Sequence, residues 1–254
     1  MPITYLLRQS FPEGTVDLRW VDSSRREVRA VEAAIEATWR DWKRKPGITL
    51  FDGPIARLEG WDVGEGQGEG QGQGRLKLAV SRTSYRLFLG TNLINPHLLQ
   101  QYGNEVGSNP IGVSTLLRTA DGHLVLGLRN DRVAFYPRRL HPFAGSLEVR
   151  DDVDVFADAR RELHEELGLL PDEVHDLRLT GIAMDTRLSQ PEMILAADTT
   201  RTLNEVVAGL DAEEHTAHWS CPATPEAARS AVETEPLLTP VATAALTLWA
   251  DTAK

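Results

Sequence analysis

Apolar residues in the first 50 positions follow a helical period. They recur at spacings of three and four and give one apolar face, made by Val28, Val31, Ile35, Trp39 and Trp42. Ser24 and Glu27 have the spacing of a capping box immediately before this run, and Pro46 follows it. The pattern predicts a helix over about 25–44 that packs against a core.

Strand-like patterns surround this helix. Residues 15–20, 48–63 and 75–80 alternate or run apolar as strands do. Gly64–Gly74 joins the last two and has glycine at every second position, a composition that buries too little apolar surface to order itself. No Lys-Ser or Lys-Thr follows it, as a phosphate-binding loop requires. We interpret it as a mobile hairpin connection.

After Pro110 the pattern predicts a sheet. Apolar runs at 111–119 and 123–130 enclose Asp121-Gly122, the turn that a tight hairpin favours. Further strands are expected at 177–187, 192–200 and 215–221, and helices at 157–167 and about 239–251. Mixed elements of this length predict an α+β or α/β layered fold.

Composition narrows the function classes. The chain has 254 residues, 41% of them hydrophobic, and a net charge of −10. This size suits one large domain or a core with an extension, and the acidity argues against nucleic-acid or anionic-membrane partners. No apolar run approaches the roughly 18 residues of a membrane span, and the start lacks a signal-peptide pattern. With Cys221 as its only cysteine, the protein is expected in the reducing cytoplasm.

Candidate chemistry concentrates in Gly145–Leu169. Phe156, Ala159, Leu163 and Leu167 form one helical stripe, while Glu162, Glu165 and Glu166 share another face. Like charges at this spacing each cost a few tenths of a kcal/mol unless a cation neutralises them, and clustered carboxylates are what Mg²⁺ or Mn²⁺ binds. The alternative is a solvated acidic face partly neutralised by Arg161.

Residues Arg161–Leu169, RELHEELGL, resemble the second half of the Nudix box, G-x5-E-x7-R-E-U-x-E-E-x-G-U with U aliphatic. The first half departs from this pattern. Asp151 stands where the box has glutamate, and nine residues instead of seven separate it from Arg161. The chain therefore resembles a Nudix hydrolase with a divergent box, which implies a mixed β-sheet sandwiched between helices, with an N-terminal β/α extension.

The resemblance also implies a ligand set. Glu162, Glu165 and Glu166 would hold Mg²⁺ or Mn²⁺ together with the backbone carbonyl near Ala144 or Gly145. Arg161 would orient a glutamate, and Asp151 ranks below the three glutamates because it is shorter and follows an insertion. Nudix enzymes commonly add one carboxylate from a later loop as ligand or general base. Glu214 is the candidate and Glu213 its rival, with an exposed acidic loop as the alternative and Glu192 a weaker choice.

Resemblance extends beyond the box. Segments 51–63, 81–92, 109–117 and 233–249 are similar to the N-terminally extended group that contains the UDP-glucose and UDP-galactose diphosphatases. Residues 1–104 would be the extension and 105–254 the Nudix domain. Tyr85 would offer a ring to the base, Arg86 a phosphate donor, and Thr91 and Asn92 a turn with free amides. The alternative is a structural turn that docks the extension.

The expected activity is Mg²⁺-dependent hydrolysis of a nucleoside diphosphate sugar, with UDP-glucose or UDP-galactose giving UMP and a hexose 1-phosphate. The partner is then a small molecule, neither nucleic acid nor membrane. Alternatives within enzymes are ADP-ribose, a dinucleotide or a nucleoside triphosphate, since the box fixes the chemistry and not the leaving groups. A non-catalytic nucleotide-sugar sensor is the alternative outside enzymes. Base, sugar, attacked phosphorus and oligomeric state stay open.

Overall fold

The strands expected after residue 110 join one mixed β-sheet in the computed structural model, which describes residues 2–45, 50–64, 74–150 and 153–253. The strand order is β1-β10-β11-β6-β7-β12, in which β11 and β6 are parallel and the other described neighbours antiparallel. The strands are β1 (Ile3–Leu7), β10 (Val174–Asp185), β11 (Gln190–Thr199), β6 (Gly112–Arg118), β7 (His123–Arg129) and β12 (His215–Pro222). The predicted hairpin at Asp121-Gly122 is therefore confirmed.

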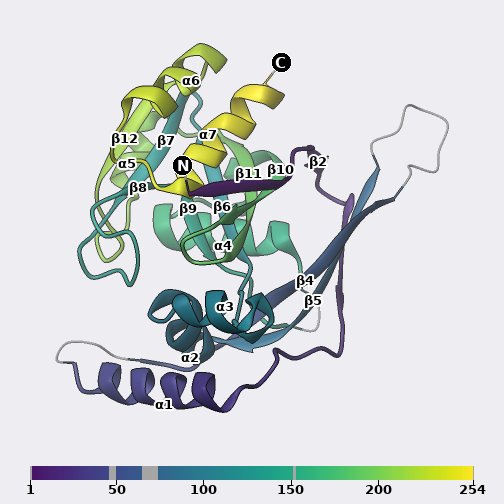
Figure 1. Cartoon of the computed structure of the whole chain (residues 1–254). Helices are drawn as coiled ribbons and strands as arrows, with labels where there is room; N and C mark the ends of the chain where they lie inside the picture. The colour runs from purple at the N-terminus through teal and green to yellow at the C-terminus, as the bar shows by residue number, and fades with distance from the viewer. Residues whose placement is uncertain (1, 46–49, 65–73, 151–152, 254) are drawn as a thin grey trace.

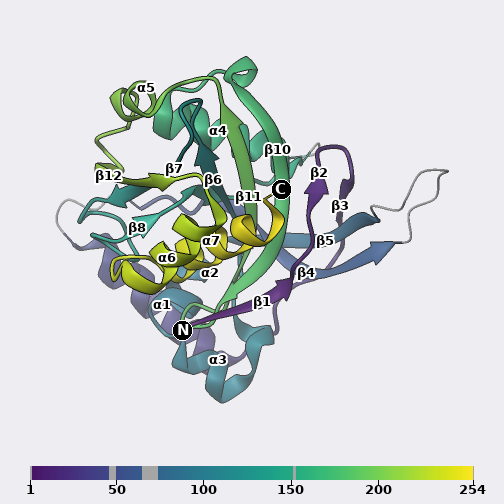
Figure 2. The ribbon, with the colours of Figure 1, turned by 90° about the horizontal axis from the view of Figure 1, so that it is seen from above.

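Helices cover both faces of this sheet (Figures 1 and 2). They are α4 (Val155–Leu167) on one face and α6 (Pro225–Thr234) with α7 (Pro240–Thr252) on the other. Side chains of β6 pack on both faces of the sheet. Val113 and Leu117 pack in the cluster that contains α4, and Leu116 packs in the cluster that contains α7. Burial on both faces explains why the strands are almost continuously apolar. The expected α+β class, a mixed sheet between helices, is confirmed.

The sheet opens between its two central strands. β6 and β7 pair only through Leu117–Val125 and Arg118–Leu124, next to their turn, and then diverge. Two short strands occupy the opening: β8 (Leu140–His141) pairs with β7, and β9 (Phe143–Ser146) pairs with β6. Polar side chains near this opening can therefore come from both sheet faces.

The N-terminal extension contains a second, three-stranded sheet of order β3-β5-β4 and a group of short helices. Figure 1 shows α1 against the α2–α3 region, and the β4–β5 hairpin projecting away from the main sheet. Its elements are β3 (Val16–Trp20), α1 (Arg29–Lys43), β4 (Pro54–Gly64), β5 (Arg75–Ser84), α2 (Tyr85–Phe88), the π-helical turn η1 (Leu89–Leu93), α3 (His97–Tyr102) and the 3₁₀ turn η2 (Asn104–Val106). The expected connection at 64–74 lies mostly outside the described residues.

Helix α1 begins later than predicted. Val28 is its N-cap and supplies no side-chain cap, so the Ser24–Glu27 capping box is not formed. The preceding residues are held by tertiary contacts instead: the Arg26 backbone N–H donates to Glu105 O at 2.8 Å, and the Arg25 guanidinium pairs with Glu32. These contacts keep the chain extended up to the helix start.

The first strands belong to the main sheet and not to the extension's sheet. β1 and β2 (Phe11–Pro12) both pair with β10. We therefore propose that the extension comprises residues 13–104, with 3–12 part of the core formed by 105–254. Two further elements, η3 (Pro171–Glu173) and α5 (Leu203–Ala208), lie in connections of that core. None of the helices in the described ranges combines the length and apolarity needed to span a membrane.

Asn92 joins the extension to the core. Its side chain is fully buried, its amide donates to Leu188 O and to Asn109 Oδ1, both at 2.8 Å, and its Oδ1 accepts from the Asn109 backbone N–H at 3.1 Å. A buried amide with partners on two chain segments fixes their relative position, because separating them leaves several polar groups unpaired.

We therefore expect Asn92→Ala to lower the free energy of unfolding by about 2–4 kcal/mol, since it leaves buried partners without hydrogen bonds. Urea titration followed by circular dichroism measures this change. Asn104→Ala, at an exposed asparagine, is the matched control and should shift stability by no more than about 0.5 kcal/mol. Equal, small effects of the two substitutions would contradict the docking role.

Candidate active site

Helix α4 begins and ends on local signals that set which of its glutamates are buried. Asp154 is the N-cap and accepts from the Phe156 N–H at 2.9 Å, and Gly168 ends the helix with a left-handed φ of 64°. Its apolar stripe is fully buried and consists of Phe156, Ala159, Leu163 and Leu167. With the stripe fixed on the sheet, Glu162 and Glu166 are buried, whereas Glu165 has a side chain that is 54% exposed.

Arg161 gathers the carboxylates of this helix. Its guanidinium lies 2.6 Å from Glu162 Oε1, 2.8 Å from Glu165 Oε2 and 3.4 Å from Asp158 Oδ1. Asp158 is itself buried and also accepts from the Arg150 guanidinium and from the Glu148 N–H. The predicted orienting role of Arg161 thus has a geometric basis in ion pairs with several of the carboxylates it would position.

The Glu162 carboxylate lies directly against the backbone of Gly145 on β9. A Cβ at position 145 would come within 1.7 Å of Glu162 Oε1, so only glycine allows this approach. Burial raises the pKa of Glu162 to about 7, while the Arg161 charge opposes that shift. A carboxylate, a backbone segment and a counter-charge therefore meet at one point of the sheet opening.

Glu166 is almost completely buried at the other end of the same helix face. One of its oxygens accepts from the Ala144 N–H at 2.6 Å, and the other contacts His215 Nε2. Burial raises the pKa of Glu166 well above its usual range, with the Glu214 charge adding to the effect, and lowers that of His215 to about 4. Nδ1 of His215 is buried and has no hydrogen-bond partner in the part of the chain that the structure describes. The neutral tautomer with the proton on Nε2 fits these facts, because it donates to Glu166 and leaves no N–H unsatisfied.

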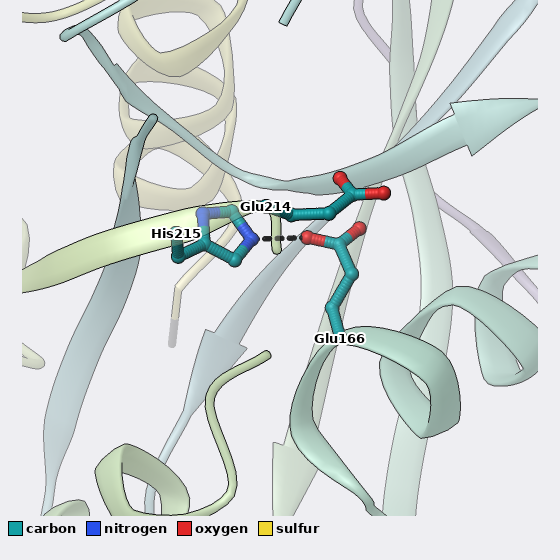
Figure 3. A group of neighbouring side chains, drawn as sticks. All are labelled: Glu166, Glu214 and His215. Atoms are coloured by element: carbon teal, nitrogen blue, oxygen red, sulfur yellow. Dashed lines mark hydrogen bonds and ion pairs between the residues drawn. The ribbon is translucent and has the colours of Figure 1, made fainter. Parts of the chain in front are cut away.

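Glu214 completes this cluster from the loop before β12. One ligand atom from each of Glu166, Glu214 and His215 lies within 4.8 Å of the other two, and Figure 3 shows both carboxylates on the same side of the imidazole. The loop is fixed by backbone bonds at 2.8 Å from Asp211 N–H to Glu166 O and at 2.9 Å from Asn130 N–H to Glu214 O. The structure thus brings Glu214 to the helix that carries the motif. Its rival Glu213 lines the neighbouring cavity but is not in this cluster.

A cavity of about 320 Å³ occupies the sheet opening beside the cluster. Its polar wall includes Gly145, Glu192, Glu214 and Arg129, and its aromatic wall is formed by Tyr85, Phe88, Phe135 and Tyr136. Glu192 is buried, accepts a hydrogen bond from Ser114 Oγ, and has a pKa that burial raises to about 8. Acidic groups therefore face a concave site that also offers flat rings.

The residues expected to bind substrate from the extension are not all brought to this cavity. Tyr85 lies in its wall, whereas the Arg86 guanidinium pairs with Glu36 of α1 and lines a different groove. Thr91 and Asn92 are fully buried, and the Thr91 hydroxyl donates to Leu87 O at 2.6 Å. These internal contacts favour the alternative interpretation of this segment, a structural turn that docks the extension.

Asp151 lies outside the described residues. Three residues that the sequence did not single out lie at or next to the site. Asp158 accepts a hydrogen bond from Arg161, His215 contacts Glu166, and Arg129 lines the cavity. Only Asp158 carried a local signal, three positions before Arg161 on the same helix. His215 and Arg129 come from strands and meet α4 only through the fold.

The donor set suits a hard divalent cation. Carboxylate oxygens of Glu162, Glu166 and Glu214 are the ligand type that Mg²⁺ and Mn²⁺ prefer. Burying several carboxylates around one opening is costly unless a cation shares their charge. The contact between Glu162 and Gly145, which a Cβ would abolish, is a second indication that this site is built for close oxygen packing. We conclude that the converging carboxylates of Glu166 and Glu214 fit such an ion, while Glu162, on the same helix, is not part of their cluster.

Comparisons with known proteins gave matches only among solved structures. No protein-family profile matches the chain, and no curated protein sequence matches it. A Deinococcus radiodurans protein matches 54% of this chain and 80% of its own, at 17% identity and a TM-score of 0.41. A hydrolase of the Nudix family from Clostridium perfringens matches 57% of this chain and 99% of its own, at 14% identity and a TM-score of 0.39. A Nudix hydrolase from M. smegmatis matches 54% of this chain and 82% of its own, at 13% identity and a TM-score of 0.35. Identities and scores of this size do not establish a shared family or activity.

The raised pKa of Glu192 predicts a pH dependence for the metal-free protein. In the folded state this carboxyl keeps its proton up to about pH 8, whereas the unfolded chain ionises it near 4.5. The unfolded state is therefore favoured progressively as pH rises between these values. Glu192→Gln removes that cost, so in EDTA it should raise the free energy of unfolding at pH 8 by roughly 2–4 kcal/mol and by much less at pH 5.

Urea titrations at the two pH values measure this difference. Glu226→Gln, at an exposed position of α6, is the control and should show no pH-dependent gain. A Glu192→Gln effect of equal size at pH 5 and pH 8 would mean that the carboxyl is not protonated in the folded protein.

Proposed function

We propose that this chain is a Nudix-type hydrolase that cleaves the diphosphate linkage of a nucleoside diphosphate sugar with Mg²⁺ or Mn²⁺. The observation that carries the proposal is the contact region of Glu166 and Glu214 beside the cavity. Glu166 belongs to α4, the helix that bears the Arg161–Leu169 motif. The motif suggests the chemistry, and the cluster supports it because Glu214 is a carboxylate of the kind that Nudix enzymes commonly add from elsewhere in the chain.

The cation would be held by Glu162 and Glu166, with Glu214 and the backbone near Gly145 as further donors. When bound, divalent cations of this kind neutralise diphosphate charge and favour attack by water. Arg161 keeps Glu162 in place through the 2.6 Å ion pair, and a hydrogen bond from neutral His215 Nε2 holds Glu166. These contacts hold the ligands in position before the substrate arrives, so little reorganisation is needed.

Glu214 is the group that we propose takes the proton from the attacking water. It belongs to a loop fixed at both ends by backbone hydrogen bonds and reaches the cavity wall. It has no ion-pair partner among the described residues, unlike Glu162 and Glu165. A carboxylate that is free of a counter-charge and lines the cavity can reach a water molecule there, which a general base must do.

The substrate class rests on the cavity walls. Aromatic rings on one side suit a nucleobase, and carboxylates that bind a cation suit a diphosphate on the other. Tyr85 comes from the extension, whose sequence resembles the UDP-sugar diphosphatase group, so UDP-glucose and UDP-galactose are the first choice. ADP-ribose, a dinucleotide, a nucleoside triphosphate or binding without turnover are the alternatives.

The first test is Glu166→Gln, which removes a buried charge from the proposed cation site. We expect kcat to fall by at least about a hundredfold, because the cation loses a ligand next to the reacting phosphate. Glu165→Gln should have a smaller effect, since that carboxylate is half exposed and paired with Arg161. Glu233→Gln, exposed on α6, is the control. Parental rates in the Glu166 variant would show that α4 does not carry the reaction.

The second test is a panel of substrates with Mg²⁺, followed by chromatography of the products. UDP-glucose or UDP-galactose should give UMP and a hexose 1-phosphate faster than ADP-ribose, NADH or nucleoside triphosphates react, because a site that hydrogen-bonds one base leaves buried groups unpaired with another. Preference for ADP-ribose or a triphosphate would overturn the substrate choice and keep the hydrolase. Tight binding of UDP-glucose with no product would favour the sensor.

A further inference from the structure

Arg129 is a buried cation that the described protein leaves without a partner. It is the last residue of β7, only 9% of its surface is exposed, and it lines the cavity in the sheet opening. Among the described residues its guanidinium has no ion pair and no hydrogen bond, and Nε is fully buried and unsatisfied. Guanidinium groups this deeply buried are normally bound to a carboxylate, a carbonyl or a phosphate.

The surroundings of Arg129 indicate what it could bind. Its guanidinium carbon lies 5.0 Å from the centre of the Phe135 ring, so the ring supports it from one side. Burial lowers its pKa, and the charges of Glu166, Glu214 and Glu192 oppose that shift although none of these carboxylates pairs with it. The guanidinium therefore lines the same cavity as the aromatic wall and is close enough to the proposed metal site to feel its carboxylates.

The aromatic wall is continuous from the extension to the core. The ring centres of Phe88 and Phe135 are 6.2 Å apart, and those of Phe135 and Tyr136 are 6.0 Å apart, both in edge-to-face geometry. Tyr85 contacts Phe88 in the same way at 6.4 Å. A planar ligand placed against these rings would bring any phosphate attached to it toward Arg129.

We propose that Arg129 binds a phosphate of the substrate diphosphate and sets the distance between the base on the aromatic wall and the carboxylates of α4. This inference rests on the proposed function and names the residue that positions its substrate. Arginine suits the role because its planar fork donates two parallel hydrogen bonds to a phosphate. The role also accounts for the unsatisfied guanidinium, whose missing acceptor is the ligand.

A buried charge kept for a ligand has a signature that a structural arginine lacks. Arg129→Met removes an unpaired buried cation and fills the space with an apolar chain, so the metal-free protein should melt at a higher temperature than the parent. The same variant should bind UDP or ADP with Mg²⁺ at least about tenfold more weakly by titration calorimetry, because it loses a charged hydrogen bond. If the arginine only packs on Phe135, melting temperature falls and affinity stays.

Two further variants sharpen this test. Arg129→Lys keeps the charge and the apolar stem but loses the fork, so its affinity for UDP or ADP should also fall, and it carries the test if Arg129→Met does not fold. Arg118→Met is the matched control. That arginine is at the end of neighbouring β6, half exposed and paired with Asp198, and its loss should leave nucleotide affinity unchanged.

The outcomes separate this inference from the proposed function. If the parent hydrolyses UDP-sugars and Arg129→Met does so with unchanged KM, the function stands and the role of Arg129 is wrong. If the parent hydrolyses nothing but binds UDP or ADP in an Arg129-dependent way, the role of Arg129 stands and the hydrolase is wrong. Absence of UDP and ADP binding by the parent protein overturns both.

Discussion

The shared counter-charge of Arg161 is the interaction on which the candidate site depends. Helix α4 must place its apolar stripe on the sheet, and this fixes the direction of every glutamate on it. Glu162, Glu165 and Asp158 would repel one another at these spacings, but each contacts the same guanidinium. Asp158 is held in turn by Arg150. The network lets an acidic helix pack closely beside the sheet opening, next to the cavity that Glu192 and Glu214 line.

The opening of the sheet creates the cavity beside this helix. β6 and β7 are neighbours at their turn and then separate, and β8 and β9 fill only part of the space. A continuous sheet would keep residues of its two faces apart, as Val113 and Leu116 are kept apart on β6. At the opening, Glu192, Arg129 and Glu214 line one cavity although they come from different strands and a loop. The site is thus a consequence of where two strands stop pairing.

Sequence reasoning located the parts of this structure that local patterns determine. The α4 helix was expected at 157–167 and is found at Val155–Leu167, because its stripe, N-cap and Gly168 are all local signals. The start of α1 was misplaced because contacts from Glu105 and Glu32 override the Ser24–Glu27 signal. β1 was missed because it is a short edge strand whose pairing with β10 is visible only in the fold.

The candidate site likewise contains residues that the sequence could identify and residues that it could not. The glutamates of α4 could be named from their spacing together with the resemblance to the Nudix box, and Glu214 from the same resemblance and its position before a strand, but His215 and Arg129 could not. An isolated histidine or arginine at a strand end has no periodic signal, and its partners are many residues away in the chain. Arg86 was expected at the substrate because of the resemblance and because arginine can donate to a phosphate, yet Glu36 of α1 pairs with it. Contacts between segments that are distant in the sequence determine where side chains of this kind lie.

Burial also determines whether the buried acids of the site are protonated before a ligand binds. The pKa values of about 7 for Glu162 and about 8 for Glu192 mean that protons neutralise much of the buried negative charge near neutral pH. A cation that binds there must displace those protons, so its apparent affinity rises with pH. Arg129, by contrast, is a guanidinium that no acceptor among the described residues satisfies. Acids that a proton can neutralise are tolerable in an empty cavity, whereas an unpaired arginine requires an anion.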